Sequence, residues 1–341
     1  MNIRHFTFSL LFFSLTIIIS CSSENPFAIC KVREYDCDYQ HRIPGIITIT
    51  KGSSRKHYFL TEKGLEKIRI KEGEPLAFNP KNRLAIAKEV TDSSIDIFTI
   101  DTDSGKRISP NISLKPHSIK DENGQTLLSV PILLSSCIQN DGTIVLLLNF
   151  EFGNLENTSY NRVFLYVYEK GDIKKIKKYD LPHYTLDENG YKGNYAERPH
   201  NLQCTGGDIY LFSEKNYSNG NPYYDKYYSQ PNWFLNKINL DPQKNEANTE
   251  ILAFIAYDDI RLNRYSEQEN TIYTVAFSSE DEMEILHKIS LSEGYELPDE
   301  PVEKENGEFL FSETTNGKSL VFFIKNRTNP DEEEKLELIK P

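Results

Sequence analysis

Short apolar segments of strand length, separated by clusters of turn-forming residues, run through almost the whole chain after residue 43. The separators are rich in Asn, Asp, Gly and Pro, each of which favours turns for its own backbone reason. No window shows the sustained 3.6-residue periodicity of an amphipathic helix. The pattern therefore predicts an all-β body. The expected strands include Ile46–Thr50, Tyr58–Leu60, Leu84–Ala87, Ile95–Ile100, Ile144–Phe150, Val163–Tyr168, Ile209–Phe212, Ile272–Phe277, Phe309–Phe311 and Leu320–Ile324.

A weak internal repeat organises these strands. An apolar strand, a polar turn and a second strand recur roughly every 60 residues, and a second hairpin follows in each unit. The recurring turns are Asn79–Arg83, Gln139–Thr143, Thr205–Asp208 and Glu267–Asn270. Units of four strands, repeated along a chain, are typical of propeller blades.

These hairpins resemble the blades of β-propellers, in particular the TolB-like and WD40-like kinds, in which an apolar strand runs into a Pro-Asp-Gly or Asn-Asp-Gly turn. Asn79-Pro80-Lys81-Asn82 and Asn140-Asp141-Gly142 carry the resemblance, and the Trp-Asp dipeptide is absent. The resemblance covers most of residues 44–341 and implies a β-propeller of about five to seven blades. The last strand (Lys335–Ile339) or the first would close the ring. The alternative is a pair of tandem β-sandwiches, whose strands follow one another at spacings of about 8–12 residues.

The N-terminus has the layout of a secretory signal: a cationic start at Arg4, an apolar stretch over Phe6–Ile19, then Ser20 and Cys21. The stretch is shorter than the roughly 20 residues that span a bilayer as a helix. Ile18-Ile19-Ser20-Cys21 resembles the lipobox of bacterial lipoproteins. The resemblance implies that residues 1–20 are a signal peptide, that cleavage precedes Cys21, and that the Cys21 thiol and α-amino group become acylated. The alternative is an unlipidated signal with Cys21 in a disulfide.

Such a lipid predicts an envelope protein held on a membrane, because each buried CH₂ contributes about 0.8 kcal/mol and several acyl chains act together. Ser22 rather than Asp follows the cysteine. In an enteric-like Gram-negative host, the sorting pattern of this family then points to the outer membrane or the cell surface. Residues 21–43 carry few strand signals and are expected to form a lipidated tether, followed by a propeller-like domain over residues 44–341.

The charge balance excludes one class of partner. The formal net charge is −12 and the pI is about 5.2. Nucleic acids and anionic lipid surfaces are bound through basic faces, so neither is an expected partner. The chain holds 20 Tyr and 19 Phe. Aromatic residues favour sheet, which supports the all-β prediction.

Four cysteines remain beside Cys21, in an exported chain where disulfides persist. Cys30 and Cys37 are close in sequence and could close a small loop, which leaves Cys137 and Cys204 as a long-range pair. The alternative is that Cys137 and Cys204 are buried free thiols. No Cys-x-x-Cys motif occurs, so the cysteines indicate neither a zinc site nor a redox motif.

Pro-His dipeptides occur at Pro116-His117, Pro182-His183 and Pro199-His200. Lactonase-type propellers carry Pro-His where blades begin, and Arg198-Pro199-His200-Asn201 is similar to them. Histidines that converge on a channel could bind a metal or act as acid and base. This resemblance implies a hydrolase or lactonase that uses His117 or His200, although no matching carboxylate ligands can be placed. The simpler interpretation is that Pro sets an extended backbone and His forms ordinary polar contacts.

The segment from Asn216 to Trp233 is unusually rich in tyrosine for a connection of its length, and long connections of this kind are often functional. Tyr and Trp supply rigid aromatic area, while Asn and Ser supply adaptable hydrogen bonds. The candidate binding residues are Tyr217, Tyr223, Tyr224, Tyr227, Tyr228 and Trp233. The alternative is that these side chains pack back on the body.

The sequence thus predicts a membrane-anchored envelope lipoprotein that binds a protein or glycan partner without catalysing a reaction. No cofactor and no metal is expected. Phosphate loops, nucleophile elbows, zinc-binding helices and dinucleotide fingerprints are absent from the sequence. The alternative function is a propeller hydrolase or lactonase with a metal site in the channel. A glycosidase would need two carboxylates that are close in space, and a sequence with 51 acidic residues does not identify them.

Overall fold

The structure is a computed structural model of the chain. It describes residues 28–30, 37–51, 53–120, 126–153, 160–172, 174–181, 196–216, 233–255, 260–278, 283–291, 301–325 and 334–339. Within these ranges nearly all regular structure is β-strand, with one 3₁₀ turn at Glu169–Gly171. The signal segment, Cys21 and the tyrosines of the 217–228 stretch lie outside the described residues.

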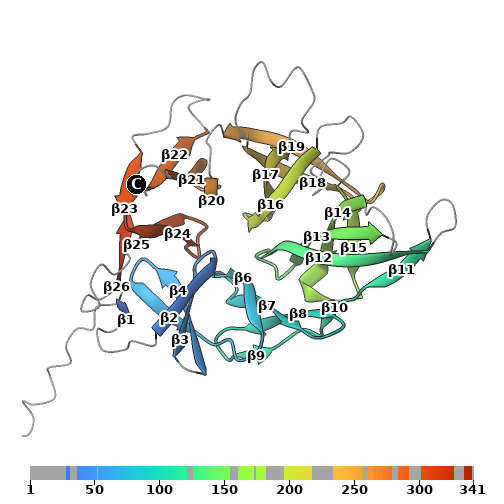
Figure 1. The fold of residues 1–341 in the computed structure, drawn as a ribbon, viewed down its shortest axis with the longest axis horizontal. Coiled ribbons are helices and arrows are strands. Elements are labelled where there is room, and N and C mark those ends of the chain that lie inside the picture. The colour runs from blue at the N-terminus through green and yellow to red at the C-terminus, as the bar shows by residue number, and fades with distance from the viewer. Residues whose placement is uncertain are drawn as a thin grey trace, which may run out of the picture.

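The strands form six blades around a central axis, as Figure 1 shows. The first blade contains β2 (Cys37–Ile43), β3 (Ile46–Lys51), β4 (Ser54–Thr61) and β5 (Gly64–Ile68). The second contains β6 (Glu74–Asn79), β7 (Leu84–Val90), β8 (Ile95–Asp101) and β10 (Ile112–Leu114), with β9 (Lys106–Arg107) also paired to β8. The third contains β12 (Thr126–Ile138), β13 (Ile144–Gly153), β14 (Tyr160–Tyr168) and β15 (Ile176–Asp180), with β11 (His117–Lys120) beside the start of β12.

The fourth blade contains β16 (Ala196–Thr205), β17 (Asp208–Asn216), β18 (Trp233–Asp241) and β19 (Glu246–Ile255). The fifth contains β20 (Ile260–Ser266), β21 (Thr271–Ser278), β22 (Met283–Ser290) and β23 (Val302–Glu305). The sixth contains β24 (Gly307–Glu313), β25 (Ser319–Lys325), β26 (Glu334–Ile339) and β1 (Ala28–Cys30). A single parallel pair, Asp180 with Glu246, joins the outer strands of blades 3 and 4.

The ring is closed by the two ends of the described chain. β1 is the outer strand of the sixth blade and pairs antiparallel with β26, so that Ala28 lies opposite Lys335. β2 is the inner strand of the first blade. The propeller therefore begins before residue 44, where the sequence analysis placed its boundary. β1 pairs with β26 at the other end of the chain and β2 pairs with β3, so both strands belong to blades. The all-β propeller is confirmed, and its blade number is six.

Each pair of neighbouring blades encloses one apolar cluster, which explains why many strands are apolar on both faces. On β13, Ile144, Leu146 and Leu148 pack in the cluster shared with blade 2. The intervening Val145 and Leu147 pack in the cluster shared with blade 4. Since successive side chains point to opposite faces of a strand, a strand between two blades buries side chains on both faces and is apolar at most positions. β21 and β25 are buried over most of their length for the same reason.

The inner strands of blades 2 to 5 share an irregularity. In each, the register with the second strand shifts by one residue, after Pro75, Leu133, Pro199 and Ile260. The extra residues are Leu76, Leu134, His200 and Arg261. A bulge of this kind bends the strand and re-aims the side chain of the extra residue. The position of His200 is therefore set by a feature that recurs from blade to blade.

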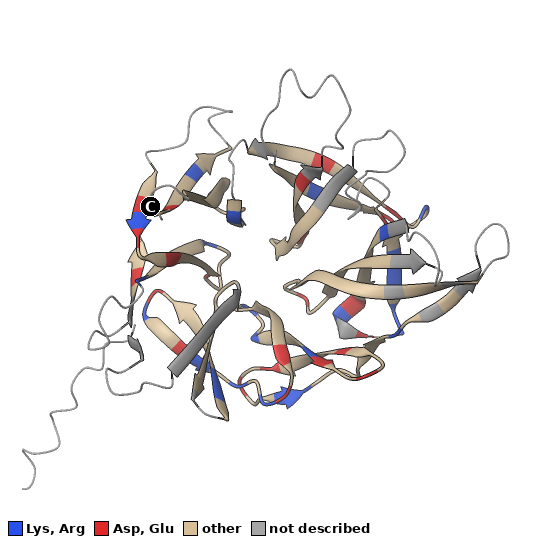
Figure 2. Cartoon of the chain, in the orientation of Figure 1, with Lys and Arg blue, Asp and Glu red and all other residues tan. Residues whose placement is uncertain are grey.

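Acidic and basic residues are interspersed around the described part of the ring and do not gather into one basic face (Figure 2). No helix among the described residues is long and apolar enough to cross a membrane.

Candidate functional site

Two hollows lie along the axis of the propeller. The first, here called the lumen hollow, has a volume of about 430 Å³ and is lined mainly by β6, β12 and β16, with Arg264 and Glu313 from β20 and β24. The second, here called the turn-end hollow, has a volume of about 450 Å³ and is lined by the inner hairpin turns. Both include Asn79, Pro80 and Glu313, so they adjoin. The recurring turns identified in the sequence therefore meet at one end of the channel.

His200 lies in the wall of the lumen hollow. Its Nε2 is 3.0 Å from Oε2 of Glu214, and its ring centroid is 4.3 Å from that of Trp233. Glu214 is near the end of β17 and Trp233 is the first residue of β18. Both partners are thus supplied by the strands that flank the tyrosine-rich segment. The structure brings together His200 and Trp233, which the sequence analysis assigned to two different candidate sites.

Trp233 is buried, with 8% of its surface exposed. Its ring packs in the cluster between blades 4 and 5, so it anchors the start of β18. Tyr217, Tyr223, Tyr224, Tyr227 and Tyr228 lie outside the described residues, and their role stays a prediction.

The backbone of His117 is on β11, where it pairs with Ser129 at the outer side of the ring (Figure 1). His183 lies outside the described residues. The described ranges contain no group of three His, Cys, Asp or Glu side chains arranged to hold a metal ion.

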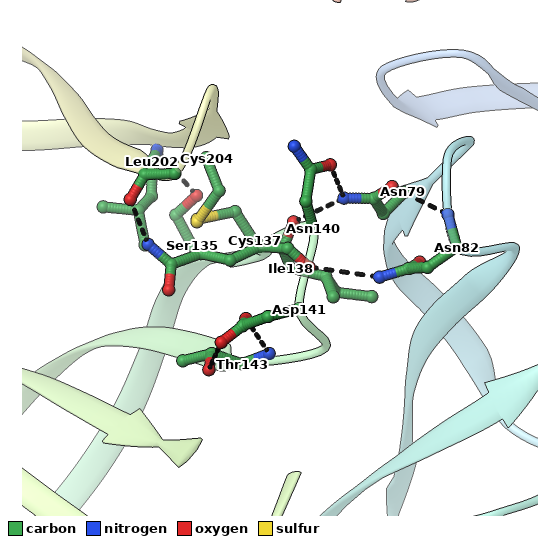
Figure 3. Close-up of a disulfide and its surroundings, with 12 residues drawn as sticks. Asn79, Asn82, Ser135, Cys137, Ile138, Asn140, Asp141, Thr143, Leu202 and Cys204 are labelled. Atoms are coloured by element: carbon green, nitrogen blue, oxygen red, sulfur yellow. Dashed lines mark hydrogen bonds between the residues drawn. A yellow bond between two sulfur atoms is a disulfide. The ribbon is translucent and has the colours of Figure 1, made fainter. Parts of the chain in front are cut away.

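A disulfide between Cys137 and Cys204 links the inner strands of blades 3 and 4 (Figure 3). This confirms the long-range pair and excludes the alternative of free thiols. Beside it, the backbone N–H of Leu202 donates to Oγ of Ser135 over 3.0 Å. Cys30 and Cys37 lie in β1 and β2, but residues 31–36 between them are outside the described ranges, so their pairing stays a prediction.

Asn79 joins blade 2 to blade 3 near the same place. Its Nδ2 donates to the carbonyl of Ile138 over 3.0 Å and to Oδ1 of Asn140 over 3.2 Å, as Figure 3 shows. Its own Oδ1 accepts from the backbone N–H of Lys81, which holds the turn. The Asn-x-x-Asn turn that resembles a propeller signature is therefore also the contact between blades.

Gln203 joins blade 4 to blade 5 in a similar way. It is 3% exposed, its Nε2 donates to the carbonyl of Tyr265, and its Oε1 accepts from the backbone N–H of Tyr265 over 3.1 Å. One buried amide side chain thus forms hydrogen bonds with both backbone groups of a residue in the next blade. Its own donor and acceptor are satisfied at the same time, as is usual for buried polar groups.

Arg264 and Glu313 form a buried salt bridge between blades 5 and 6. Burial raises the pKa of the Glu313 carboxyl, and the negative charge of Glu267 raises it further. The Arg264 guanidinium and the hydrogen bond from Thr205 lower this pKa. The final link runs from blade 6 to blade 1, where Oγ of Ser312 donates to the carbonyl of Leu60 over 2.7 Å. Polar contacts therefore join successive blades around the channel wall.

Sequence reasoning missed Gln203, Arg264 and Glu313. Each lies within three residues of an inner turn, and the repeat places these turns together. The positions of these residues beside the inner turns were therefore visible in the sequence, although no motif marks the side chains themselves.

No known protein-family profile matches the sequence, and no curated protein matches it. The chain is structurally similar to a mutant of the Synechocystis apocarotenoid oxygenase, with 10% identity and a TM-score of 0.42 over 84% of this chain and 65% of that one. The chain thus spans less than two thirds of the oxygenase.

Two other solved structures are similar at the same level. A subtype N11 neuraminidase-like protein of A/flat-faced bat/Peru has 11% identity and a TM-score of 0.41 over 91% of this chain and 93% of that one. A xylan beta-1,4-xylosidase from Bacillus halodurans has 12% identity and a TM-score of 0.37 over 80% and 55%. At such identities and scores, these similarities assign no activity to this chain.

Proposed function

We propose that this protein is a lipid-anchored binding module of the bacterial cell envelope, in which a rigid six-bladed ring presents a protein or glycan partner site beside His200 and Trp233. The observation that carries the proposal is the position of Glu214 and Trp233. They flank the tyrosine-rich segment in sequence, and both contact His200 at the channel wall. His200 from the hydrolase hypothesis and Trp233 from the binding hypothesis are therefore in contact.

The described surroundings of His200 supply one carboxylate partner. Its Nε2 is paired with Glu214, and its ring packs near Trp233. Such a carboxylate can orient a general base as well as a binding side chain, so the pair is compatible with both functions. The alternative of a channel hydrolase would require a further partner for His200 from the residues that line the lumen hollow.

The anchor is tested by metabolic labelling with an alkyne-bearing palmitate. We expect the wild-type chain to be labelled and the Cys21→Ala variant to be unlabelled and released from membranes. Labelling that persists in the variant would show that the lipid is not on Cys21.

The binding role is tested by cross-linking in intact cells, followed by mass spectrometry of the captured species. We expect the variant with Tyr223, Tyr224, Tyr227 and Tyr228 all changed to Ser to lose the partner while keeping the wild-type circular dichroism spectrum. The matched control is Ile251→Ser on the outer strand of the same blade, which is 54% exposed and should keep the partner. An unchanged partner in the quadruple variant would contradict the proposed role of this segment.

A further inference from the structure

The turn-end hollow is lined almost entirely by side chains that form hydrogen bonds. Its amide and hydroxyl groups come from blades 2 to 6, and its remaining positions are Pro80, Gly206 and Gly317. The polar residues are Asn79, Lys81, Asn140, Thr205, Glu267, Gln268, Glu313, Thr314, Thr315 and Asn316. The volume of about 450 Å³ is in the range of small-molecule sites. Pro80 is the one apolar side chain among the described residues that line it, so the hollow suits a hydrophilic ligand.

Glu267 is held at the wall of this hollow by its neighbours in blade 4. Its Oε1 accepts from the Tyr210 hydroxyl over 3.4 Å. Gly206 has a φ of +59°, and a Cβ at that position would collide with the Glu267 carboxylate. Glycine is the residue that tolerates a positive φ at no steric cost, and here it also leaves room for the carboxylate.

Two cations share the surroundings of Glu267: Lys81 lines the same hollow, and Lys237, which is paired with Asp208, interacts with the Glu267 charge. Glu313 has Arg264 as its partner, and Glu269 accepts hydrogen bonds from Ser266 and Tyr273. Glu267 forms no direct salt bridge within the described part of the chain, and its negative charge contributes to the raised pKa of the Glu313 carboxyl and of the Tyr210 hydroxyl. A cationic group in the hollow would therefore form the first direct ion pair of Glu267 among the described residues.

The adjoining channel wall also holds an unused donor. Arg264 is 8% exposed, and its Nε–H has no hydrogen-bond partner among the described residues, although its Nη2 pairs with Glu313. Buried donors left unsatisfied are rare in folded proteins, and an oxygen of a ligand or of an ordered water would satisfy this one.

We propose that the turn-end hollow binds a small polyhydroxylated primary amine, such as an amino sugar. Its ammonium would pair with Glu267, and its hydroxyls would exchange hydrogen bonds with the amide and hydroxyl side chains of the inner turns. A charge-assisted hydrogen bond to a partly buried carboxylate is stronger than a neutral one, so the amine sets the preference. This site involves the opposite end of the inner strands from the region of Trp233 and does not depend on the function proposed above.

The test is isothermal titration calorimetry of the detergent-solubilised full chain with glucosamine, glucose and N-acetylglucosamine at neutral pH. These probes share the sugar ring, and only glucosamine carries the ammonium. We expect glucosamine to bind at least about ten-fold more tightly than the other two, as one charge-assisted hydrogen bond implies. Equal affinities for the three sugars would overturn the proposal. So would the absence of glucosamine binding at 10 mM, a concentration on the order of the dissociation constants of weak ligands.

Variants locate the site. Glu267→Gln keeps the size of the side chain and removes its charge, so we expect it to lower the affinity for glucosamine about ten-fold and to leave glucose unchanged. The control is Glu303→Gln on β23, an exposed position at the outer edge of the same blade that removes the same charge. An equal loss in both variants would show a general charge effect and contradict the site. The comparison of the three sugars uses the unaltered chain, so it holds even if a variant fails to fold.

Discussion

Cys137 on β12 and Cys204 on β16 form a disulfide whose Cα atoms are 5.5 Å apart, and it joins two blades across 67 residues of sequence. The inner strands around the channel carry such links in succession: Asn79, this disulfide, Gln203, Arg264 with Glu313, and Ser312. In a propeller each blade contacts only its neighbours, so links between inner strands fix how the blades are arranged around the central axis.

The disulfide should contribute strongly to stability. A link that closes a loop of this length restricts the unfolded chain, and we expect the Cys137→Ser/Cys204→Ser variant to lose about 2–4 kcal/mol of unfolding free energy. The measurement is urea unfolding followed by tryptophan fluorescence. Dithiothreitol should lower the stability of the wild type by more than that of the variant, which lacks this disulfide. A variant as stable as the wild type would contradict the role of the link.

Removing only one partner of the Arg264–Glu313 pair should strongly lower the free energy of unfolding. Both side chains are mostly buried, and removing the cation alone would leave a buried carboxylate without its partner. We expect Arg264→Met to lose about 3–5 kcal/mol in urea unfolding, and the double variant Arg264→Met/Glu313→Leu to recover much of that loss. A double variant no more stable than Arg264→Met would show that the pair is not coupled.

His57 should make stability fall in mild acid. It is 5% exposed and its Nδ1 is 2.9 Å from Oγ1 of Thr48. Burial lowers the pKa of the His57 imidazole, and Arg55 lowers it further. The unfolded chain therefore binds the proton more readily, and the folded state loses stability as the pH falls below the ordinary value of about 6.5.

The corresponding experiment compares the wild type with His57→Gln in urea unfolding at pH 7 and pH 5. We expect the wild type to lose more stability than the variant over this interval. Equal losses in the two proteins would show that His57 does not contribute to the acid sensitivity.

Glu284 should have the opposite pH dependence. It is 4% exposed, and it accepts the backbone N–H of Phe309 over 2.6 Å between blades 5 and 6. Burial raises the pKa of the Glu284 carboxyl, while the hydrogen bond from Phe309 opposes the rise. The folded state then holds the proton more tightly than the unfolded state, so this group costs stability as the pH rises above about 4.3 and through the raised pKa.

Replacing Glu284 with Gln keeps the acceptor for Phe309 and removes the titration. The difference in unfolding free energy between Glu284→Gln and the wild type should therefore shift in favour of the variant between pH 4 and pH 7, measured by urea unfolding at both values. A difference that is independent of pH would contradict the raised pKa.

Much of the architecture was predictable because it depends on local patterns. The segments Ile144–Leu148 and Leu320–Ile324 are continuous apolar runs, and each lies in a strand with a neighbouring blade on both faces. The Asp101–Gly105 segment forms a hairpin turn of local origin: Oδ1 of Asp101 accepts from the backbone N–H groups of Asp103 and Ser104. Turn chemistry acts within four residues, so the sequence reveals it.

The candidate site was less predictable because its members are separated by many residues. Arg264 and Glu313 are 49 positions apart, and Gln203 and Tyr265 are 62 apart. Nothing within a few residues of any of them signals its partner. The histidines illustrate the same limit: three Pro-His dipeptides look alike in sequence, yet His200 reaches the lumen hollow and His117 pairs at the outer side of the ring.

The sequence by itself determined that the chain is built of repeated β-hairpins and where the inner turns lie, because side-chain alternation and turn propensity are properties of neighbouring residues. The tertiary structure decided that the blades number six, that β1 closes the ring on β26, and that Cys137 meets Cys204. It also decided that Glu267 lines the turn-end hollow without a direct salt bridge among the described residues. These features depend on which inner strands become neighbours once the twist of each blade and the bulges at Leu134 and His200 set the curvature of the ring.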